Sequence, residues 1–376
     1  MIPVAKIFLD DQEKHLISEV IDSGWITQGP MVEKFEREFA RRVEADYAVA
    51  VSNCTTGLFL SLHCAGIGRG DEVIVPSFSF IASANAIVHI GASPVFVDID
   101  PDTYNVDLEA VEKAIGPRVK AIMPVHQVGQ AADLDRIYSL ADKHGLAVIE
   151  DAACAIGSQY KNRPVGSRAK YACFSFHPRK VITTGEGGMI TTNDLGIATK
   201  LRLLRHQGMA VSDLARHKSD KVIFESYPVI GYNFRLTDVQ AAIGLVQLTK
   251  LPSFLEKRAR LAKLYNELFS SNEYLQCPYV PDYSRHNFQS YILRFKPECP
   301  ISCNALMQEL LEKGIATRRG VMCSHLELAY ADIGRRMPLD KSECAVEETM
   351  IIPLYPGLTD SELQHVVDSI MQATMV

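Results

Sequence analysis

Residues 173–188 read Cys-Phe-Ser-Phe-His-Pro-Arg-Lys-Val-Ile-Thr-Thr-Gly-Glu-Gly-Gly. This stretch places Lys180 between an apolar strand and a glycine-rich turn, where a lysine can be held away from bulk water. Burial disfavours the ammonium form, and the neutral amine is the form that attacks a carbonyl to make a Schiff base. The alternative is a surface lysine on a loop, as most lysines are. The rest of the sequence has to decide between the two.

Length and composition set the broad class. The chain has 376 residues, of which 47% are apolar and 22% charged, which predicts a globular protein with one large domain and an appendage, or two domains. The net charge of −6 argues against a nucleic-acid partner. No apolar run is long enough for a membrane span, and the N-terminus does not read as a secretion signal. The nine cysteines are scattered, so we expect reduced thiols, a cytoplasmic protein and no metal site.

Short runs rich in Val and Ile alternate with helical stretches over the first half of the chain. Between Asp133 and Gly145 the apolar residues follow the spacing of one helix face, and Gly145 ends the helix. This alternation predicts an α/β fold with a large, mostly parallel seven-stranded sheet covered on both faces. The expected strands are 47–51, 72–76, 94–97, 121–125, 146–150, 171–176 and 189–192.

The C-terminal part of the sequence predicts a smaller α+β domain. Residues 236–270 read as two helices, 236–247 and 254–269, separated by a break at Pro252. Strands are expected at 290–295 and 349–354, and helices at 304–313 and 360–374. We therefore divide the chain into a large domain, 1–248, and a small domain, 249–376. The large domain includes a helical N-terminal segment that is interrupted at 24–30.

Candidate ligand-binding residues follow the predicted strands, because ligands of parallel sheets gather at the carboxyl ends of the strands. Thr55 and Thr56 follow the first strand and open an apolar helix, whose free backbone N–H groups could hold a phosphate. The alternative is an ordinary helix cap. Asp151 follows the fifth strand, where a buried carboxylate needs a partner such as a protonated pyridine nitrogen; a helix cap is again the alternative.

Two further residues complete the set. Phe80 follows the second strand and could cover a flat ring, or it could pack in the core. Ser175 lies five residues before Lys180 and could add a phosphate contact. Pyridoxal 5′-phosphate (PLP) requires four things of a protein: a phosphate cradle, an aromatic side chain that covers the ring, a carboxylate for the ring nitrogen and a reactive lysine.

On these residues the chain resembles the DegT/DnrJ/EryC1/StrS family of PLP-dependent sugar aminotransferases. The resemblance runs nearly end to end and is carried by long motifs at 23–30, 70–77, 149–153, 174–180, 185–188 and 231–238. It implies the aspartate-aminotransferase-like fold (PLP fold type I) and a homodimer with active sites at the subunit interface.

The resemblance also implies roles for individual residues. Lys180 would form the Schiff base, Asp151 would contact the ring nitrogen and Phe80 would stack on the ring. Asn233 matches the asparagine that reaches the phosphate of the neighbouring subunit's cofactor; its alternative is a loop residue that caps the next helix. The expected phosphate contacts are Thr55, Thr56 and Ser175.

Two departures from the family pattern bear on the substrate. Cys154 stands where the family often has Gln or His, and enzymes acting at sugar C3 tend to have Gln there, so Cys154, expected beside the cofactor, favours a 4-keto sugar. Its alternative is a small core filler. Gln127 and Val128 replace an aromatic that the family commonly shows before Gly129, which puts contacts from this loop in doubt.

The implied activity is transfer of an amino group from glutamate to a nucleotide-linked keto-sugar, for amino-sugar biosynthesis of a surface polysaccharide or a glycosylated metabolite. Lys180 would move the proton as general base and acid, in two half-reactions. One alternative is a dehydratase on the same scaffold, in which histidine replaces the lysine; another is a non-catalytic regulator. Neither a nucleic acid nor a membrane is expected as a partner. The candidate substrate contacts are Trp25, Thr27, His177, Arg318 and His325, for which packing, capping or solvation are the alternatives.

Overall fold

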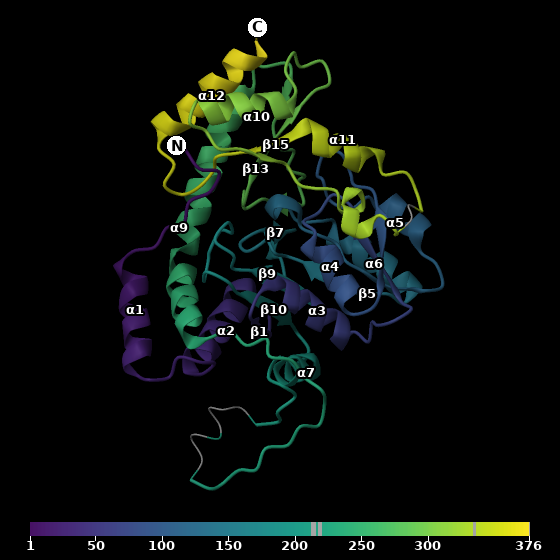
Figure 1. Cartoon of the computed structure of the whole chain (residues 1–376), viewed down its shortest axis with the longest axis vertical. Coiled ribbons are helices and arrows are strands. Elements are labelled where there is room, and N and C mark those ends of the chain that lie inside the picture. The colour runs from purple at the N-terminus through teal and green to yellow at the C-terminus, as the bar shows by residue number, and fades with distance from the viewer. Residues whose placement is uncertain (212–215, 217–219, 334–335, 376) are drawn as a thin grey trace.

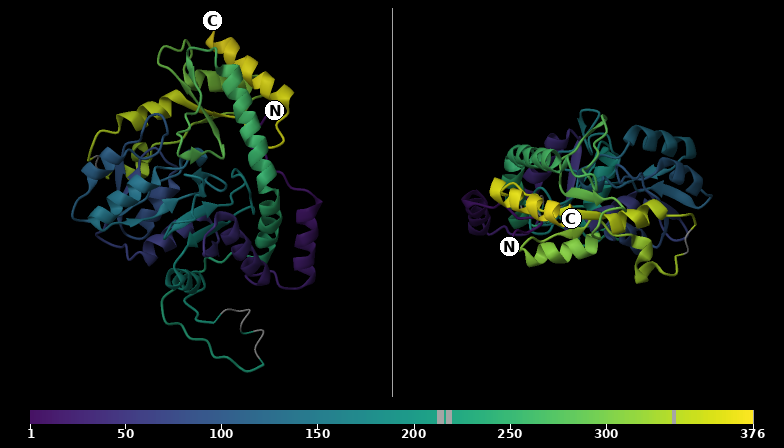
Figure 2. Two further views of the ribbon diagram at one scale, coloured as in Figure 1. Left: turned by 180° about the vertical axis from the view of Figure 1, so that it is seen from behind. Right: turned by 90° about the horizontal axis from the view of Figure 1, so that it is seen from above.

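The computed structural model describes residues 1–211, 216, 220–333 and 336–375. A large unit built on a central sheet carries a smaller unit at one end, and one long helix runs from the first into the second (Figures 1 and 2). The N-terminal residues lie beside the smaller unit, near the C-terminal helix (Figure 1). Ile2 pairs there with Ile315.

The central sheet is the one expected from the alternating apolar runs. Its segments are β1 (Tyr47–Val51), β2 (Glu72–Pro76), β3 (Ser93–Val97), β4 (Val119–Ile122), β5 (Ala147–Val148), β6 (Glu150–Asp151), β9 (Ala172–Ser175) and β10 (Gly188–Thr192). The short β5 and β6 are two halves of one strand around Ile149, whose N–H donates to the carbonyl of Ile122 over 3.0 Å. The eight segments thus make seven strands in the order β1-β10-β9-β6/β5-β4-β2-β3. β10 is antiparallel to both of its neighbours, and the pairs from β9 to β3 are parallel, as predicted.

Helices cover both faces of the sheet, which is why most residues of its strands are buried and apolar. One apolar cluster packs the rings of Phe35 and Phe39 against Phe174 and Phe176. A second cluster lies on the other side and includes Leu58. The predicted helix after 133 is α6, with Gly145 at φ 63° as its left-handed C-cap. The helices of this unit are α1 (Asp11–Asp22), α2 (Pro30–Val43), α3 (Cys54–Cys64), α4 (Ala82–His89), α5 (Leu108–Ala114), α6 (Leu134–His144) and α7 (Leu195–Arg205).

The predicted break at Pro252 is wrong, because α9 runs unbroken from Asp238 to Phe269. A proline inside a helix costs about 3 kcal/mol, since it removes one hydrogen bond and crowds the preceding turn. Burial on both sides of Pro252 offsets this cost: Leu251 and Phe254 are buried in the core of the large unit. Farther along, Tyr265 lies in the core of the small unit. The division that we predict after residue 248 falls inside this helix.

The small unit is built on an antiparallel sheet in the order β11-β13-β15-β14. Its edge meets the large unit just after β2, where the Ser79 N–H donates to the Met322 carbonyl over 3.1 Å and the Ser324 N–H to the Ser77 carbonyl over 2.9 Å. This junction places one end of the small sheet over the carboxyl ends of the large one. The strands are β11 (Leu275–Gln276), β13 (Tyr291–Phe295), β14 (Arg318–Arg319) and β15 (Thr349–Ile352), and the helices are α10 (Cys303–Glu312), α11 (Asp340–Glu348) and α12 (Asp360–Thr374).

Minor elements complete the chain. A three-stranded sheet is formed by β7 (Gln159–Tyr160), β8 (Arg163–Pro164) and β12 (Ser284–Arg285), and the 3₁₀ turns are η1 (Gln127–Gly129), η2 (Ser324–Leu326) and η3 (Leu328–Tyr330). None of the helices in the described ranges combines the length and the apolar character that a bilayer crossing requires.

Candidate active site

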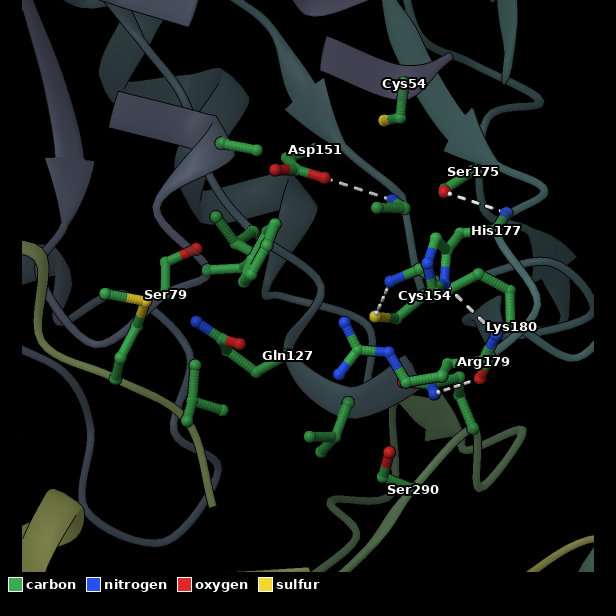
Figure 3. Close-up of a pocket in the computed structure, with 18 of the residues that line it drawn as sticks. Cys54, Ser79, Gln127, Asp151, Cys154, Ser175, His177, Arg179, Lys180 and Ser290 are labelled. Atoms are coloured by element: carbon green, nitrogen blue, oxygen red, sulfur yellow. Dashed lines mark hydrogen bonds between the residues drawn. The ribbon is translucent and has the colours of Figure 1, made fainter. Parts of the chain in front are cut away.

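A cavity of about 1290 Å³ opens between the carboxyl ends of the large sheet and the small unit. The large unit contributes the start of α3 and the loops after β2, β6 and β9, and the small unit contributes β14 and the residues after it. Figure 3 shows part of this lining. The residues predicted from the sequence that line it are Thr55, Thr56, Phe80, Asp151, Cys154, Ser175, His177, Lys180 and Arg318.

The amine of Lys180 points into this cavity. Its Nζ donates to Sγ of Cys154 over 3.1 Å, and its backbone N–H donates to the His177 carbonyl over 2.8 Å in the turn after β9 (Figure 3). Burial lowers the pKa of Lys180, but the charge and hydrogen bond of Cys154 and the charge of Asp151 raise it by more, so the pKa lies above the ordinary lysine value. We expected burial to favour the neutral amine; the neighbouring Cys154 and Asp151 reverse that effect.

Asp151 presents a buried carboxylate to the same cavity. Its side chain accepts a hydrogen bond from the Ser83 hydroxyl over 2.7 Å and another from the Ala153 N–H over 3.1 Å. Ser83 lies 3.0 Å from the hydroxyl of Ser79, which also lines the cavity. Sequence reasoning did not single out Ser83, although its place on α4, just after β2, is the kind of position from which ligand-site residues come.

A buried network fixes the strand that carries Asp151. His126 Nδ1 accepts the Ala132 N–H over 3.1 Å, so its Nε2 carries the proton and donates to Glu150, 3.1 Å away. The Tyr138 hydroxyl donates to the other oxygen of Glu150. Burial first, and the charge of Glu150 second, raise the pKa of Tyr138, so the phenol stays protonated. Two hydrogen bonds to Glu150, which does not line the cavity, thus hold the strand β6 that carries Asp151.

The start of α3 forms the predicted phosphate end, and it is also a capped helix start. Asn53 accepts the Thr56 N–H over 2.9 Å, and the Thr56 hydroxyl donates back to the Asn53 carbonyl over 2.8 Å. The helix is therefore capped by Asn53 with Thr56 as its capping-box partner, and Thr55 and Thr56 both line the cavity. Gly188 allows β10 to pass close by, since a Cβ there would lie 2.6 Å from the Asn53 carbonyl carbon. Ser175 completes this end, and its hydroxyl accepts the His177 N–H over 3.4 Å.

Phe80 is an exposed aromatic on the cavity wall. Its exposed fraction is 59%, whereas Phe78, two residues earlier, is fully buried in the core. The core-packing alternative therefore applies to Phe78 and not to Phe80. An aromatic face left open to a cavity is available to cover a planar ligand.

The chemistry of this lining fits PLP. A primary amine at Lys180 suits the aldehyde, a carboxylate at Asp151 suits a protonated ring nitrogen, and the first turn of α3 suits a phosphate. These three groups come from three different strand ends, so the fold brings them together.

Further residues of the lining bear on the substrate. His177 Nδ1 accepts the Arg179 N–H over 3.2 Å, which leaves the proton on Nε2. Arg318 and Arg319 are exposed on β14, at the small-unit side of the cavity. The loop that departs from the family pattern also reaches the cavity: Gln127 lines it and donates its amide to the Phe78 carbonyl. Arg179, which the sequence analysis did not single out, precedes the lysine and lines the cavity too.

Three predicted substrate contacts lie outside this lining. The Trp25 indole donates to the Gln28 carbonyl over 3.1 Å, and the Thr27 carbonyl accepts the Asp238 N–H over 3.0 Å, both in the connection between α1 and α2. His325 is buried between the two units, where its ring bonds to the Ser77 hydroxyl and, over 3.0 Å, to Glu343. The structure of the single chain does not bring these three residues together with Lys180.

Asn233 also lies away from the cavity of its own chain. It is exposed, its side-chain oxygen accepts from Arg235 Nε over 3.1 Å, and its backbone pairs with His206. These residues lie at the base of the connection between α7 and α9, whose described residues extend from the body of the molecule (Figure 1). Phe224 and Ile230 on this connection are 88% and 89% exposed.

Comparison with known proteins agrees with this geometry. The DegT/DnrJ/EryC1/StrS aminotransferase family matches residues 8–371. The chain is 40% identical to GDP-perosamine synthase of Caulobacter vibrioides, over 99% of this chain and 98% of that protein. It is 37% identical to the spore coat polysaccharide biosynthesis protein SpsC of Bacillus subtilis, over 98% of this chain and 96% of that protein. The PLP form of Spr1654 from Streptococcus pneumoniae superimposes with a TM-score of 0.92 at 28% identity, covering 100% of this chain and 98% of that one.

These similarities confirm the fold type I architecture, the cofactor PLP and the aminotransferase activity that the sequence predicts. The chain belongs to the DegT/DnrJ/EryC1/StrS family of PLP-dependent sugar aminotransferases.

Proposed function

We propose that this enzyme transfers the amino group of glutamate to a nucleotide-linked keto-sugar, and that 4-keto sugars are favoured over 3-keto sugars. The observation that carries the proposal is that one cavity holds the Lys180 amine, the Asp151 carboxylate and the two arginines of β14. The amine and carboxylate suit amino transfer, and the arginines suit a diphosphate. The names of the relatives support a product used in building a polysaccharide or another glycosylated compound.

We assign the following roles to the residues of the chain. Bound PLP supplies an electron-withdrawing ring that stabilises the negative charge on a carbon losing its proton. Asp151 would accept a hydrogen bond from the ring nitrogen and thereby keep that nitrogen protonated. Lys180 takes the proton from the substrate carbon and returns one, acting as general base and acid. The phosphate would be held by the first turn of α3 with Thr55, Thr56 and Ser175, while Phe80 would cover the ring and Cys154 would lie beside it.

The sugar position is proposed from Cys154. Its thiol contacts the Lys180 amine, so a short side chain lines the cavity next to the reacting group. A glutamine at this position would extend farther and offer amide hydrogen bonds to the sugar. The shorter thiol favours an acceptor whose carbonyl lies at C4.

We further propose a homodimer with shared active sites. Asn233 is exposed and absent from the lining of its own cavity, which suits a residue that reaches the phosphate bound by the other subunit. The exposed Phe224 and Ile230 on the same connection offer apolar surface for a second subunit. Trp25 and Thr27 would reach a substrate only across this interface. We place the enzyme in the cytoplasm, where its nine cysteine thiols would stay reduced.

The test is a panel of nucleotide-linked 3-keto and 4-keto sugars incubated with the PLP-loaded enzyme and glutamate, with amine formation followed by mass spectrometry. We expect amino-sugar from the 4-keto substrates. Lys180→Ala should reduce turnover by a factor of about 10²–10⁴ or more, because it removes the proton-transferring group. Lys170→Ala, at an exposed position outside the cavity, is the matched control. Failure of every keto-sugar to accept an amine would refute the acceptor class.

A further inference from the structure

Arg179 is a cation of the cavity that the roles above leave unused. Its backbone is held on both sides: its N–H donates to His177 Nδ1 over 3.2 Å, and its carbonyl accepts from Gln289 Nε2 over 3.0 Å. Its side chain is exposed and lines the cavity together with that of Lys180 (Figure 3). A fixed backbone directs a long side chain more reproducibly than a free loop does, because fewer backbone conformations have to be lost when a ligand binds.

The guanidinium of Arg179 has no acidic partner within the described parts of the chain. Some arginines of the protein are paired: Arg205 contacts Glu36, and Arg336 contacts Glu72. An arginine that faces a cavity without a counter-charge is suited to an anionic ligand, and its planar fork matches a carboxylate with two parallel hydrogen bonds.

Position in the chain distinguishes Arg179 from the arginines of β14. It immediately precedes Lys180 in the turn after β9, and both side chains line the same cavity, so Arg179 is placed to serve a part of a substrate close to the reacting amine. In an amino acid, the α-carboxylate is attached to the same carbon as the amine. In a nucleotide-linked keto-sugar, by contrast, the sugar ring separates the diphosphate from the carbonyl carbon that accepts the amine.

We propose that Arg179 binds the α-carboxylate of the amino donor, and that Arg318 binds the diphosphate of the acceptor. The inference rests on the proposed function, which it deepens by giving the two substrates separate anion sites in one cavity. Ser290, which lines the cavity near Arg179 in Figure 3, offers a hydroxyl to the same carboxylate. His177, whose Nδ1 accepts the Arg179 backbone N–H, keeps its Nε2–H as a further hydrogen-bond donor in the same part of the cavity.

The experiment measures the two half-reactions separately in the PLP-loaded protein. The first half is followed by the loss of the visible absorbance of bound PLP on adding L-glutamate, and the second by its return on adding the keto-sugar. Arg179→Gln should weaken the apparent affinity for L-glutamate roughly 10- to 100-fold, because a charge-assisted hydrogen-bond pair is lost, and leave the second half unchanged. Arg318→Gln should instead weaken the apparent affinity for the keto-sugar and leave the first half-reaction unchanged.

Controls separate a binding role from a folding role. Arg163→Gln removes an exposed arginine outside the cavity and should change neither half. Arg179→Lys should recover part of the affinity for glutamate, since it keeps the charge without the fork. The thermal unfolding midpoint and the absorbance of bound PLP in Arg179→Gln should match those of the wild type.

L-Glutamine identifies which carboxylate is bound, because it keeps the α-carboxylate and lacks the γ-carboxylate. Arg179→Gln should weaken the apparent affinity for L-glutamine, even if it is a slow donor, by the same factor as the apparent affinity for L-glutamate. A loss of affinity confined to L-glutamate would assign Arg179 to the γ-carboxylate and overturn the proposal. A loss of affinity for the keto-sugar, or no loss in either half-reaction, would also overturn it.

Failure of the proposed function gives a different result. If the wild type takes an amine from L-glutamate but passes it to no keto-sugar, the acceptor is wrong and the Arg179 result still stands. If another L-amino acid is the donor, the glutamate assignment is wrong, and the same loss in Arg179→Gln is expected with that amino acid, because the α-carboxylate is common to both.

Discussion

The Nζ atom of Lys180 lies 3.1 Å from Sγ of Cys154. The contact joins the proposed proton-transferring group to the residue that departs from the family pattern. The thiol and the nearby Asp151 outweigh burial and raise the pKa of Lys180. In the protein without cofactor the amine is therefore held as an ammonium ion, the form that cannot attack an aldehyde.

Cys154→Ala should lower the pKa of Lys180, because it removes a charge and a hydrogen bond that raise the pKa while burial, which lowers it, remains. At a given pH below that pKa a larger fraction of the amine is then neutral. The rate at which cofactor-free protein reattaches PLP should rise, and its pH profile should move to lower pH. Stopped-flow absorbance from pH 6 to 10 measures this.

Cys344→Ala, at an exposed thiol on α11, is the control and should leave the profile in place. A profile for Cys154→Ala that stays put or moves to higher pH would show that the thiol does not set the basicity of Lys180.

Gly188→Ala should disturb the proposed phosphate end. The added methyl would lie 2.6 Å from the Asn53 carbonyl carbon and 2.7 Å from the Cys54 nitrogen, both backbone atoms, so the start of α3 must move. We expect a loss of about 1–3 kcal/mol in unfolding free energy from overpacking and a weaker PLP complex. Equilibrium dialysis and urea unfolding measure the two effects.

Gly196→Ala is the matched substitution, because the nearest contact of its added methyl is the end of the Asp194 side chain at 3.1 Å. It should leave PLP affinity unchanged. Equal PLP affinities in the two variants would contradict a phosphate site at the start of α3.

Mixing two inactive variants should restore activity if subunits share active sites. Lys180→Ala lacks the amine, and Asn233→Asp places a negative charge where a phosphate is expected. In a mixed dimer one site carries both defects and the other carries neither. Random reassembly should then give about a quarter of the wild-type sites in active form.

The assay is turnover after the two variants are co-expressed or unfolded and refolded together. Each variant refolded alone is the baseline. Recovery no greater than this baseline would indicate that each chain completes its own site.

Tyr138→Phe should destabilise the protein by about 1–3 kcal/mol, because it leaves one oxygen of the buried Glu150 without its donor. Tyr330→Phe removes a phenol that donates to the uncharged Asn85 over 2.6 Å and should cost less. Thermal unfolding of the cofactor-free proteins compares them. An equal or smaller effect in Tyr138→Phe would mean that Glu150 does not depend on the tyrosine.

Much of the large unit could be predicted from the sequence, because its information is local. A strand buried on both faces is mostly apolar, so the strands of the sheet appear as short apolar runs, several of them rich in Val and Ile. The carboxyl ends of parallel strands then bring Thr55, Asp151 and Lys180 to one cavity. The place of Phe80 in the cavity wall could be predicted in the same way, because Phe80 follows the carboxyl end of β2.

Features that depend on packing between distant segments could not be predicted. Local propensity breaks the chain at Pro252, but burial of Leu251 and Phe254 keeps α9 intact. A histidine such as His325 is a residue type that often contacts substrates, yet the fold places it against Ser77, 248 residues away in the chain.

By itself, then, the sequence determined the α/β sheet and the family, and it predicted Lys180 as the reactive lysine, because periodicity and motifs are properties of neighbouring residues. Only the tertiary structure decided the direction in which the pKa of Lys180 shifts, since the groups that raise it arrive from another strand. It also decided which of the many arginines face the cavity, because the direction of a side chain depends on contacts such as those that hold the backbone of Arg179.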